Sequence, residues 1–442
     1  MSPAPLSTGS PNANPGSASL LSFQEAFAHV SAFAARSARL CPPAQRVPLG
    51  KALDRVLAES ISADADQPPF ARSTRDGFAC RASEVSRHRP LAIAGSTRAG
   101  QPPSGLLPRG SAWEIMTGGA VPPGADAVVM LEHVEIAGAP SARTIRLLSP
   151  RTVERGDNVV ARAAQARTGD HLLPAGTLIG PAQIALAAAC GCSTLSVFAR
   201  PRVAILATGD ELVPIRSTPA PGQVRDSSSA MLSALVSAAG GEPWVLPVAR
   251  DTARSLDAAI ARASAADVLL IAGGVSAGKF DLVEPALARA GARFHFTGVR
   301  IQPGKPLVFA ELPARITKTA RGLRRTQCCF GLPGNPVSSA VTFLLFAVPV
   351  VAALAGRRER GPRFALARLG ADAKAKAGLT RFLPASCTFA GPLPEVVPVP
   401  FQGSGDLAAM ARANCFVVVP EEGDQRRKSR LKAGATVRIL LP

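Results

Sequence analysis

Apolar residues recur at helical spacing over residues 22–40, and Ser22 is followed three positions later by Glu25. This spacing is a capping box, in which each side chain satisfies a backbone N–H of the first helical turn. The pattern therefore predicts a helix that begins at Ser22. A second apolar run, at residues 182–189, also predicts a helix.

Between these helices the pattern changes to short β-prone runs, such as 127–130 and 144–148, separated by many Pro and Gly residues. Such punctuation is typical of a small β domain. We therefore expect residues 63–152 to form a β-rich insert. Residues 21–62 and 153–199, on either side of it, are expected to form one discontinuous N-terminal domain of mixed structure.

From residue 200 to 358, β-prone and helical runs alternate. The alternation predicts a central α/β domain with a mostly parallel sheet, whose ligands would bind outside the carboxyl ends of the strands. The expected strands are 202–207, 244–248, 267–272, 293–297 and 328–332, and the expected helices are 227–239, 253–265 and 281–290.

The remaining segments complete an α/β multidomain chain. Short β runs at 416–419 and 436–440 predict a small C-terminal β-barrel or sandwich over residues 359–442. Residues 1–20, rich in Ser, Pro, Gly and Asn, are expected to be a disordered tail. Residues 337–355 are apolar enough to span a bilayer. A buried helix is preferred, because the run follows a Gly-Asn-Pro turn and contains Pro349.

Composition narrows the possible functions. The formal charge of +19 favours anionic ligands, but no zinc-finger spacing or aromatic RNA-binding motif accompanies it, which argues against nucleic-acid binding. The eight cysteines form no C-x-x-C pair, and the five histidines are scattered. Buried free thiols and the absence of a secretory signal pattern predict a cytoplasmic protein without a Cys or His metal site.

Glycine and polar residues follow successive elements of the α/β domain. Glycine lets backbone N–H groups approach an anion, and a hydroxyl or a lysine adds a donor or a full charge. Each loop alone is usually only a turn. Together at one sheet edge they predict a cleft lined by phosphate-binding groups. The four loops are Thr208-Gly209-Asp210-Glu211, Gly273-Gly274-Val275-Ser276-Ala277-Gly278, Pro303-Gly304-Lys305-Pro306 and Leu332-Pro333-Gly334-Asn335-Pro336.

Carboxylates stand in or near these loops at Glu211, Asp251 and Asp281. Mg²⁺ is commonly held by one or two carboxylates together with substrate phosphate oxygens. A Mg²⁺ site at Asp251 and Asp281 is therefore one interpretation. The other is that Asp251 and Asp281 only cap the helices that follow them.

The loops resemble those of the molybdopterin molybdenumtransferases, the MoeA and gephyrin E-domain type. The resemblance extends to the predicted insert and barrel, and covers residues 22 to the end. The matching stretches are 208–212, 273–278 with Asp281, 303–306, 332–338, 73–79, 115–129, and 402–405 with 413–414.

The resemblance implies four domains per subunit and an elongated homodimer, whose active site lies between the α/β domain of one subunit and the insert of the other. It implies that adenylylated molybdopterin and molybdate are substrates. The adenylate would be hydrolysed with Mg²⁺, and the molybdenum cofactor would pass to molybdoenzymes or their chaperones, with no membrane involved.

Carried over by position, catalytic roles fall to Asp76 and Thr117 from the partner subunit, and to Glu211, Asp281 and Lys305. Metal binding falls to Asp251 and Asp281. Substrate and cofactor binding falls to Thr208, Gly209, Asp210, Gly273, Gly274, Ser276, Gly278, Pro303, Gly304, Pro306, Gly334, Asn335, Pro336, Ser338 and Ser404.

The sequence also departs from the family pattern. Val160 and Gln165 stand where the family usually has Arg and Asp, Arg75 replaces a Met, and Gln302 replaces a Lys. These changes leave open a catalytically impaired molybdopterin-binding paralogue or scaffold. An adenylyltransferase would need only the α/β domain, and a nucleic-acid binder would use the +19 charge; both are further alternatives.

Overall fold

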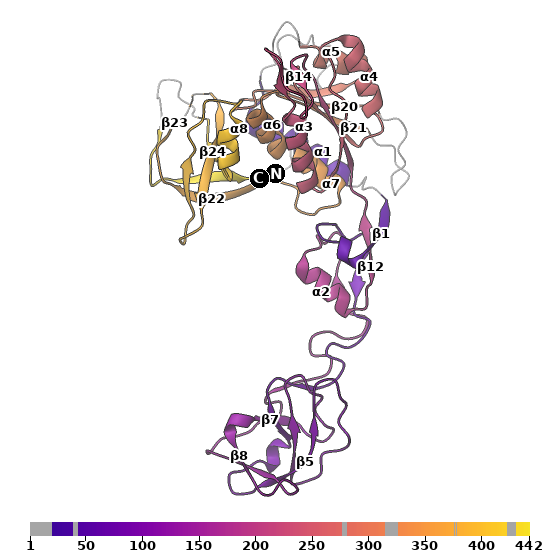
Figure 1. Cartoon of the computed structure of the whole chain (residues 1–442), viewed down its shortest axis with the longest axis vertical. Coiled ribbons are helices and arrows are strands. Elements are labelled where there is room, and N and C mark those ends of the chain that lie inside the picture. The colour runs from indigo at the N-terminus through magenta and orange to yellow at the C-terminus, as the bar shows by residue number, and fades with distance from the viewer. Residues whose placement is uncertain are drawn as a thin grey trace, which may run out of the picture.

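The computed structural model describes residues 20–38, 43–275, 281–313, 326–374, 376, 378–421 and 430–442. The molecule is elongated (Figure 1). The α/β domain and the C-terminal barrel lie side by side at one end, a small linker module follows, and the β insert lies at the far end. The predicted α/β multidomain fold is confirmed.

Helix α1 (Phe23–Ser37) begins where the capping box predicts. The Ser22 side chain accepts a bond from the Glu25 N–H at 3.2 Å, and Glu25 accepts one from the Ser22 N–H at 2.7 Å. Its buried residues, among them Val30 and Phe33, join the core of the α/β domain. The helix therefore packs on the α/β domain, although its sequence neighbours belong to the linker module.

The linker module is built from two chain segments that meet on either side of the insert. Strands β1 and β12 pair antiparallel, as do β2 and β11. Leu57, Ile179 and Val197 are central to its small core. The elements are β1 (Ala44–Pro48), η2 (Leu49–Lys51), β2 (Ile61–Ser62), β11 (His171–Leu173), α2 (Pro181–Ala189) and β12 (Thr194–Phe198).

The insert is β-rich, as predicted. Its six-stranded sheet has the order β7-β4-β6-β5-β9-β8, and β5 and β6 are its parallel pair. The elements are β3 (Arg72–Ser73), β4 (Gly77–Cys80), η3 (Ala82–Glu84), β5 (Leu91–Thr97), β6 (Ser111–Ile115), β7 (Ala127–Met130), η4 (Leu131–His133), β8 (Val134–Ala137), β9 (Thr144–Leu147) and β10 (Val159–Val160).

The six-stranded sheet of the α/β domain has the order β16-β13-β17-β21-β20-β18. The first four strands are parallel, but β20 and β18 run antiparallel to their neighbours. The sequence pattern does not predict β20 or the antiparallel edge of the sheet. It places residues 303–306 at the end of a strand or helix, whereas they lead into β20. The strands are β13 (Arg202–Ala207), β14 (Leu212–Val213), β15 (Val224–Arg225), β16 (Glu242–Val245), β17 (Val268–Ala272), β18 (Arg293–Gly298), β19 (Ile301–Gln302), β20 (Pro306–Leu312) and β21 (Gln327–Leu332).

The long apolar run forms α6 (Pro336–Thr342), a π-helical turn at Phe343–Ala347, and α7 (Val348–Leu354). Pro349 lacks an N–H for the usual bond to residue 345, and a π turn accommodates such a break. Among the described residues, Pro336–Leu354 is long and apolar enough to span a bilayer, but 94% of its most apolar window is buried. The run is thus a core helix of this domain. The other helices are α3 (Ser228–Ala238), α4 (Ala253–Ala263) and α5 (Val283–Arg289).

The C-terminal domain is a barrel. Strands follow the order β24-β25-β22-β28-β26, and β26 pairs with β24 to close the ring. Strand β19 of the preceding domain adds to β24 in parallel, which joins the two domains by backbone hydrogen bonding. The elements are β22 (Arg363–Leu369), β23 (Ala373–Lys374), β24 (Thr380–Thr388), β25 (Glu395–Pro398), α8 (Leu407–Arg412), β26 (Cys415–Val419), β27 (Arg430–Leu431) and β28 (Thr436–Leu441).

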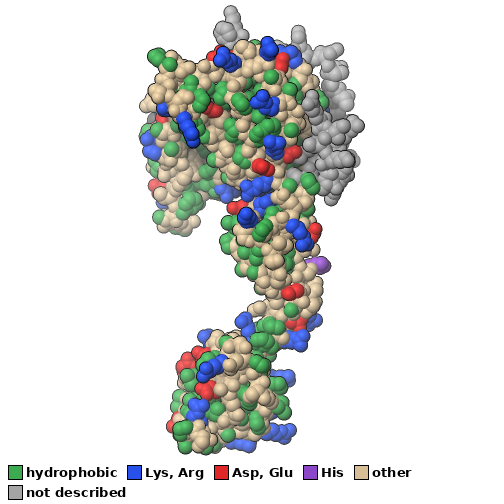
Figure 2. Space-filling model, turned by 45° about the vertical axis from the view of Figure 1, so that its right-hand side comes forward, with side chains coloured by type: hydrophobic (Ala, Val, Ile, Leu, Met, Phe, Trp, Pro, Cys, Tyr) green, Lys and Arg blue, Asp and Glu red, His purple; other side chains and the backbone are tan. Residues whose placement is uncertain are grey.

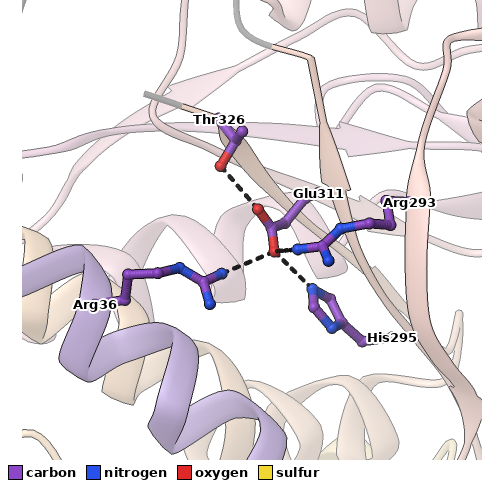
Figure 3. Close-up of polar contacts among 5 residues, drawn as sticks. All are labelled: Arg36, Arg293, His295, Glu311 and Thr326. Carbon is purple, nitrogen blue, oxygen red and sulfur yellow. Dashed lines mark hydrogen bonds and ion pairs between the residues drawn. The ribbon is translucent and has the colours of Figure 1, made fainter. Parts of the chain in front are cut away.

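A polar cluster fastens α1 to the antiparallel edge of the sheet (Figure 3). One carboxylate oxygen of Glu311, on β20, accepts bonds from Arg36 at 2.9 Å, Arg293 at 2.5 Å and His295 at 2.8 Å. Its other oxygen accepts a bond from the Thr326 hydroxyl at 3.0 Å. The Glu311 side chain is only 8% exposed, so it depends on these partners for the hydrogen bonds that water would otherwise supply.

Replacing Glu311 with Gln should destabilise the protein by about 2 kcal/mol. The neutral amide cannot accept charge-assisted bonds from three donors, but both arginines are more than half exposed, which reduces the loss. Chemical denaturation would measure the change. Glu135→Gln, at an exposed pair with Arg146, is the matched control and should change stability by less than about 1 kcal/mol.

Acid should weaken the same cluster. Burial lowers the pKa of His295 below 6.5, although its bond to Glu311 acts in the opposite direction. Burial raises the pKa of Glu311, but the bonds from His295, Thr326 and Arg293 outweigh this and hold it below 4.5. Each group has a lower pKa in the folded protein than in the unfolded chain. The fold is therefore stabilised when the pH is above the unfolded-state pKa, and this stabilisation is lost as the pH falls. The temperature of the unfolding midpoint should therefore decrease as the pH drops below 6.5. Below pH 4.5 the further decrease should be smaller in the Glu311→Gln variant than in the wild type.

Candidate functional site

A cleft of about 1270 Å³ opens between the α/β domain and the barrel. All four predicted glycine-containing loops contribute to its wall. The predicted residues that line it are Thr208, Gly209, Glu211, Asp251, Gly273, Gly274, Asp281, Pro303, Gly304, Lys305, Pro306, Gly334, Asn335, Pro336, Ser338 and Ser404. Ser276 and Gly278 lie outside the described residues, and Asp210 lies beside the cleft wall.

The loop after β13 is held by carboxylate contacts. The Thr208 hydroxyl donates to Asp251 at 2.7 Å, and Asp251 and Asp210 exchange long backbone-to-carboxylate bonds of 3.4 Å. The N-cap of α4 is Thr252, whose own side chain accepts the Ser255 N–H. The helix-capping interpretation of Asp251 is therefore wrong: its carboxylate faces the neighbouring strand end.

Gly273 follows β17 with φ +105°, a backbone conformation that residues other than glycine avoid. A Cβ atom at this position would lie 2.6 Å from the Thr208 carbonyl oxygen. Glycine therefore lets the loops after β13 and β17 approach each other. Asp281 lies one residue before Leu282, the N-cap of α5, and also lines the cleft.

Lys305 reaches this edge because β20 runs antiparallel. Residue 308 of β20 pairs with Gly331 of β21, so the start of β20 lies beside the carboxyl end of β21. Gly304 has φ +109°, and a Cβ there would lie 2.6 Å from a Thr342 methyl group. The Lys305 side chain is exposed to the cleft, where its charge can meet an anionic ligand.

The barrel supplies the facing wall, and two contacts fix it against the α/β domain. The Asn335 amide donates to the Ser404 hydroxyl at 2.8 Å, and the Val337 N–H donates to the Ser404 carbonyl at 3.0 Å. Lys376 and Arg381 also line the cleft. Sequence reasoning missed both cations, because nothing in the local pattern indicates that β24 would pair with β19 beside Lys305.

Replacing Ser404 with Ala should loosen this contact between the domains. The Asn335 amide would lose an acceptor while the backbone bond to Val337 remains, so stability should fall by about 1 kcal/mol. Thermal unfolding would measure this, with Ser237→Ala, an exposed helix serine, as the control. An equal change in the two variants would argue against the contact.

The cleft can accommodate a magnesium ion bound together with a phosphorylated ligand. No cluster of three or more Cys, His, Asp or Glu side chains occurs among the described residues. Asp251 and Asp281 nevertheless line one cleft, and Mg²⁺ needs only one or two protein carboxylates when phosphate oxygens and waters complete its shell. Burial and the charge of Asp281 raise the pKa of neighbouring Glu284.

Comparison with known families accounts for most of the chain. Three family descriptions match in order: "MoeA N-terminal region (domain I and II)" over residues 21–191, "Probable molybdopterin binding domain" over 204–353, and "MoeA C-terminal region (domain IV)" over 366–441. A molybdopterin molybdenumtransferase of Staphylococcus aureus (strain COL) is 32% identical over 90% of this chain and 91% of its own length. The chain belongs to the molybdopterin molybdenumtransferase family. A relative of the same name from Nostoc sp. is 38% identical over 70% of this chain and 69% of its own length.

Solved structures agree with this family assignment. A molybdopterin biosynthesis MoeA protein from Pyrococcus horikoshii matches with a TM-score of 0.72 and 31% identity, over 96% of this chain and 99% of that one. A second structure of this name from the same organism, strain OT3, gives a TM-score of 0.76 at 26% identity, over 96% and 100% of the two chains. The likeness thus includes the insert and the barrel as well as the α/β domain.

Two residues of the family motifs lie in the insert, away from the cleft of their own chain. Asp76 accepts bonds from the Thr117 N–H at 2.6 Å and from the Thr117 hydroxyl at 2.9 Å. These bonds lower the pKa of Asp76, so the exposed carboxylate stays charged. Neither residue lines the cleft. The α/β domain and the barrel, which form the cleft, lie at the opposite end of the molecule from the insert (Figure 1).

Two positions that depart from the family pattern, Val160 and Gln165, lie where the chain returns from the insert to the linker module, whereas Arg75 lies in the insert and Gln302 lines the cleft. Val160 pairs with Arg72 in a two-residue ladder, and the Gln165 N–H bonds to the Gln67 carbonyl. Arg162 forms an ion pair with Asp66 at 2.7 Å. Arg162 therefore has a structural partner within this chain.

Proposed function

We propose that this protein inserts molybdenum into molybdopterin, using molybdate and adenylylated molybdopterin as substrates and releasing AMP and the molybdenum cofactor. One observation carries the proposal. In a chain of this family, Lys305, three carboxylates and several glycine turns from distant segments line a single cleft. The cleft is therefore suited to a ligand with several negative oxygens.

The chemistry requires water to cleave a phosphoanhydride, whose reaction depends on positioning and charge stabilisation. Lys305 stabilises negative charge that builds on the phosphate oxygens. Thr208, bonded to Asp251, keeps that carboxylate oriented towards the cleft. Mg²⁺ held by Asp251 and Asp281 would neutralise part of the phosphate charge.

Molybdate is itself an oxyanion and calls for similar donors. Lys305 offers a positive charge, Ser338 a hydroxyl, and the barrel adds Arg381 and Lys376 on the facing wall. Ser338 is buried, at 4% exposed, in the cleft wall. We infer that this wall holds molybdate while the loops after β13 and β17 hold the adenylate.

We further propose a homodimer in the cytoplasm, in which the insert of one subunit completes the cleft of the other. Asp76, a charged carboxylate, and its partner Thr117 are both exposed far from their own cleft, which supports this arrangement. The product would then pass to a molybdoenzyme or its chaperone, with no role for a membrane or nucleic acid.

Single-turnover release of AMP tests the proposal. Purified protein is mixed with adenylylated molybdopterin, molybdate and Mg²⁺, and AMP is measured over time. Asp281→Ala should release AMP at least about 100-fold more slowly, whereas Asp257→Ala, at an exposed pair on α4, should match the wild type. Tight substrate binding without AMP release would contradict the enzyme and support a non-catalytic binding protein.

A further inference from the structure

Arginine side chains gather where the linker module meets the α/β domain. Arg55 and Arg200 come from the linker side, Arg357 from the end of the α/β domain, and Arg363 from the start of the barrel strand β22. Figure 2 shows Lys and Arg side chains concentrated at this narrow neck. We call these four residues the neck arginine cluster. Among the described residues, none of the four forms an ion pair with an Asp or Glu side chain, although Arg363 donates to a main-chain oxygen of Pro442 and Asp54 lies beside the others. Four guanidinium groups beside one carboxylate leave the cluster with a net positive charge.

The four guanidinium groups influence one another. Burial lowers the pKa of Arg357. The charge of Asp54 opposes this, and the smaller effects of Arg200 and Arg363 lower the pKa further. Burial and Arg200 likewise lower the pKa of Arg55, against a single opposing carboxylate at Glu242. Like charges held this close are unfavourable unless a counter-charge is bound.

One donor of the cluster lacks a partner. The Nε atom of Arg357 is buried and makes no hydrogen bond, and the remaining contact of this side chain, to the Ala238 carbonyl, is long at 3.4 Å. Arg55 uses one nitrogen for the Phe198 carbonyl at 2.9 Å and keeps its other N–H groups. Buried donors are nearly always bonded in folded proteins, so this N–H indicates a missing acceptor.

The cluster surrounds a small hollow of about 10 Å³, lined by Arg55, Arg200 and Arg357 together with Asp54, Phe198 and Gly240. This is room for about one oxygen-sized group. None of the four arginines lines the large cleft. The hollow is thus a separate feature, too small for a whole metabolite.

We propose that the neck arginine cluster binds a phosphate group, with one oxygen in the hollow at the unpartnered Arg357 N–H and the other oxygens facing solvent. Guanidinium groups suit this ligand because they donate several N–H bonds to phosphate oxygens. The arginines that line the hollow belong to both the linker module and the α/β domain. A bound phosphate would therefore fasten the junction on which the position of the insert depends.

Calorimetric titration with inorganic phosphate tests the site, with sodium chloride at equal ionic strength as the salt control. Arg200→Gln and Arg357→Gln should each weaken phosphate binding at least about tenfold. Arg262→Gln, an exposed arginine on α4, removes the same charge elsewhere and should bind like the wild type. The Arg200 side chain makes no hydrogen bond to the other described residues, so its variant should fold even if Arg357→Gln does not.

The large cleft must be separated from this site. Binding that survives in Lys305→Gln and weakens in Arg200→Gln supports the proposal, and hydrogen exchange should slow at residues 49–56 and 239–242 when phosphate is added. Binding lost in Lys305→Gln but kept in Arg200→Gln would place the phosphate in the cleft and overturn it. An equal response to chloride would also overturn it. Titration with glycerol 3-phosphate distinguishes a phosphomonoester ligand from free phosphate. Tighter binding of glycerol 3-phosphate indicates a phosphomonoester, and tighter binding of inorganic phosphate indicates the free ion.

Discussion

Replacing Lys305 with Gln should slow molybdenum transfer at least about 100-fold, because a preorganised donor at a developing negative charge contributes on this scale. The side chain is exposed to the cleft and bears on no core contact, so the variant should fold normally. AMP release and cofactor formation in a single turnover would be measured together. Both should fall, since the proposed mechanism uses Lys305 for the adenylate and for molybdate.

Lys51→Gln is the matched control, an exposed lysine in the linker module that should leave turnover unchanged. A Lys305→Gln enzyme within about threefold of wild type would remove this residue from the mechanism. The cleft would then bind its ligand without help from the positive charge of Lys305.

The second large effect concerns the partner subunit. Asp76→Ala and Lys305→Gln should each nearly abolish activity, but a random mixture of the two subunits should recover about a quarter of it. Half of the dimers would be mixed, and each mixed dimer has one site with both walls intact. Activity of the co-expressed, co-purified mixture provides the measurement.

Lys305→Gln mixed with Asp281→Ala is the control for this experiment. Both changes lie on the wall that the α/β domain supplies, so every mixed dimer has two damaged sites and no recovery is expected. If Asp76 and Lys305 variants also failed to restore each other, the insert would not act across the dimer. That result would leave the family assignment unchanged but would contradict the proposed active site between two subunits.

Local sequence predicted the elements that depend on neighbouring residues. The Ser22–Glu25 capping box placed the start of α1, and strand β13 was predicted with its observed bounds, because its apolar run ends sharply at Thr208. The glycine turns that end β13, β17 and β21 were identified for the same reason. Glycine, Pro and Asn restrict the backbone locally, and those restrictions can be read without knowing the fold.

Features that depend on pairing between distant segments could not be predicted. The antiparallel direction of β20 brings Lys305 to the cleft, and it is set by pairing with β18 and β21, because an apolar strand carries no mark of direction. Arg381 reaches the cleft because β24 closes a barrel and pairs with β19.

The sequence alone therefore identified the family through seven motifs and predicted which loops bind anions. Only the tertiary structure decided that the barrel supplies a second cationic wall, that α1 packs on the α/β domain through Glu311, and that Asp76 lies far from its own cleft. The physical reason is that turn chemistry acts over a few residues, whereas strand pairing and packing join residues hundreds of positions apart.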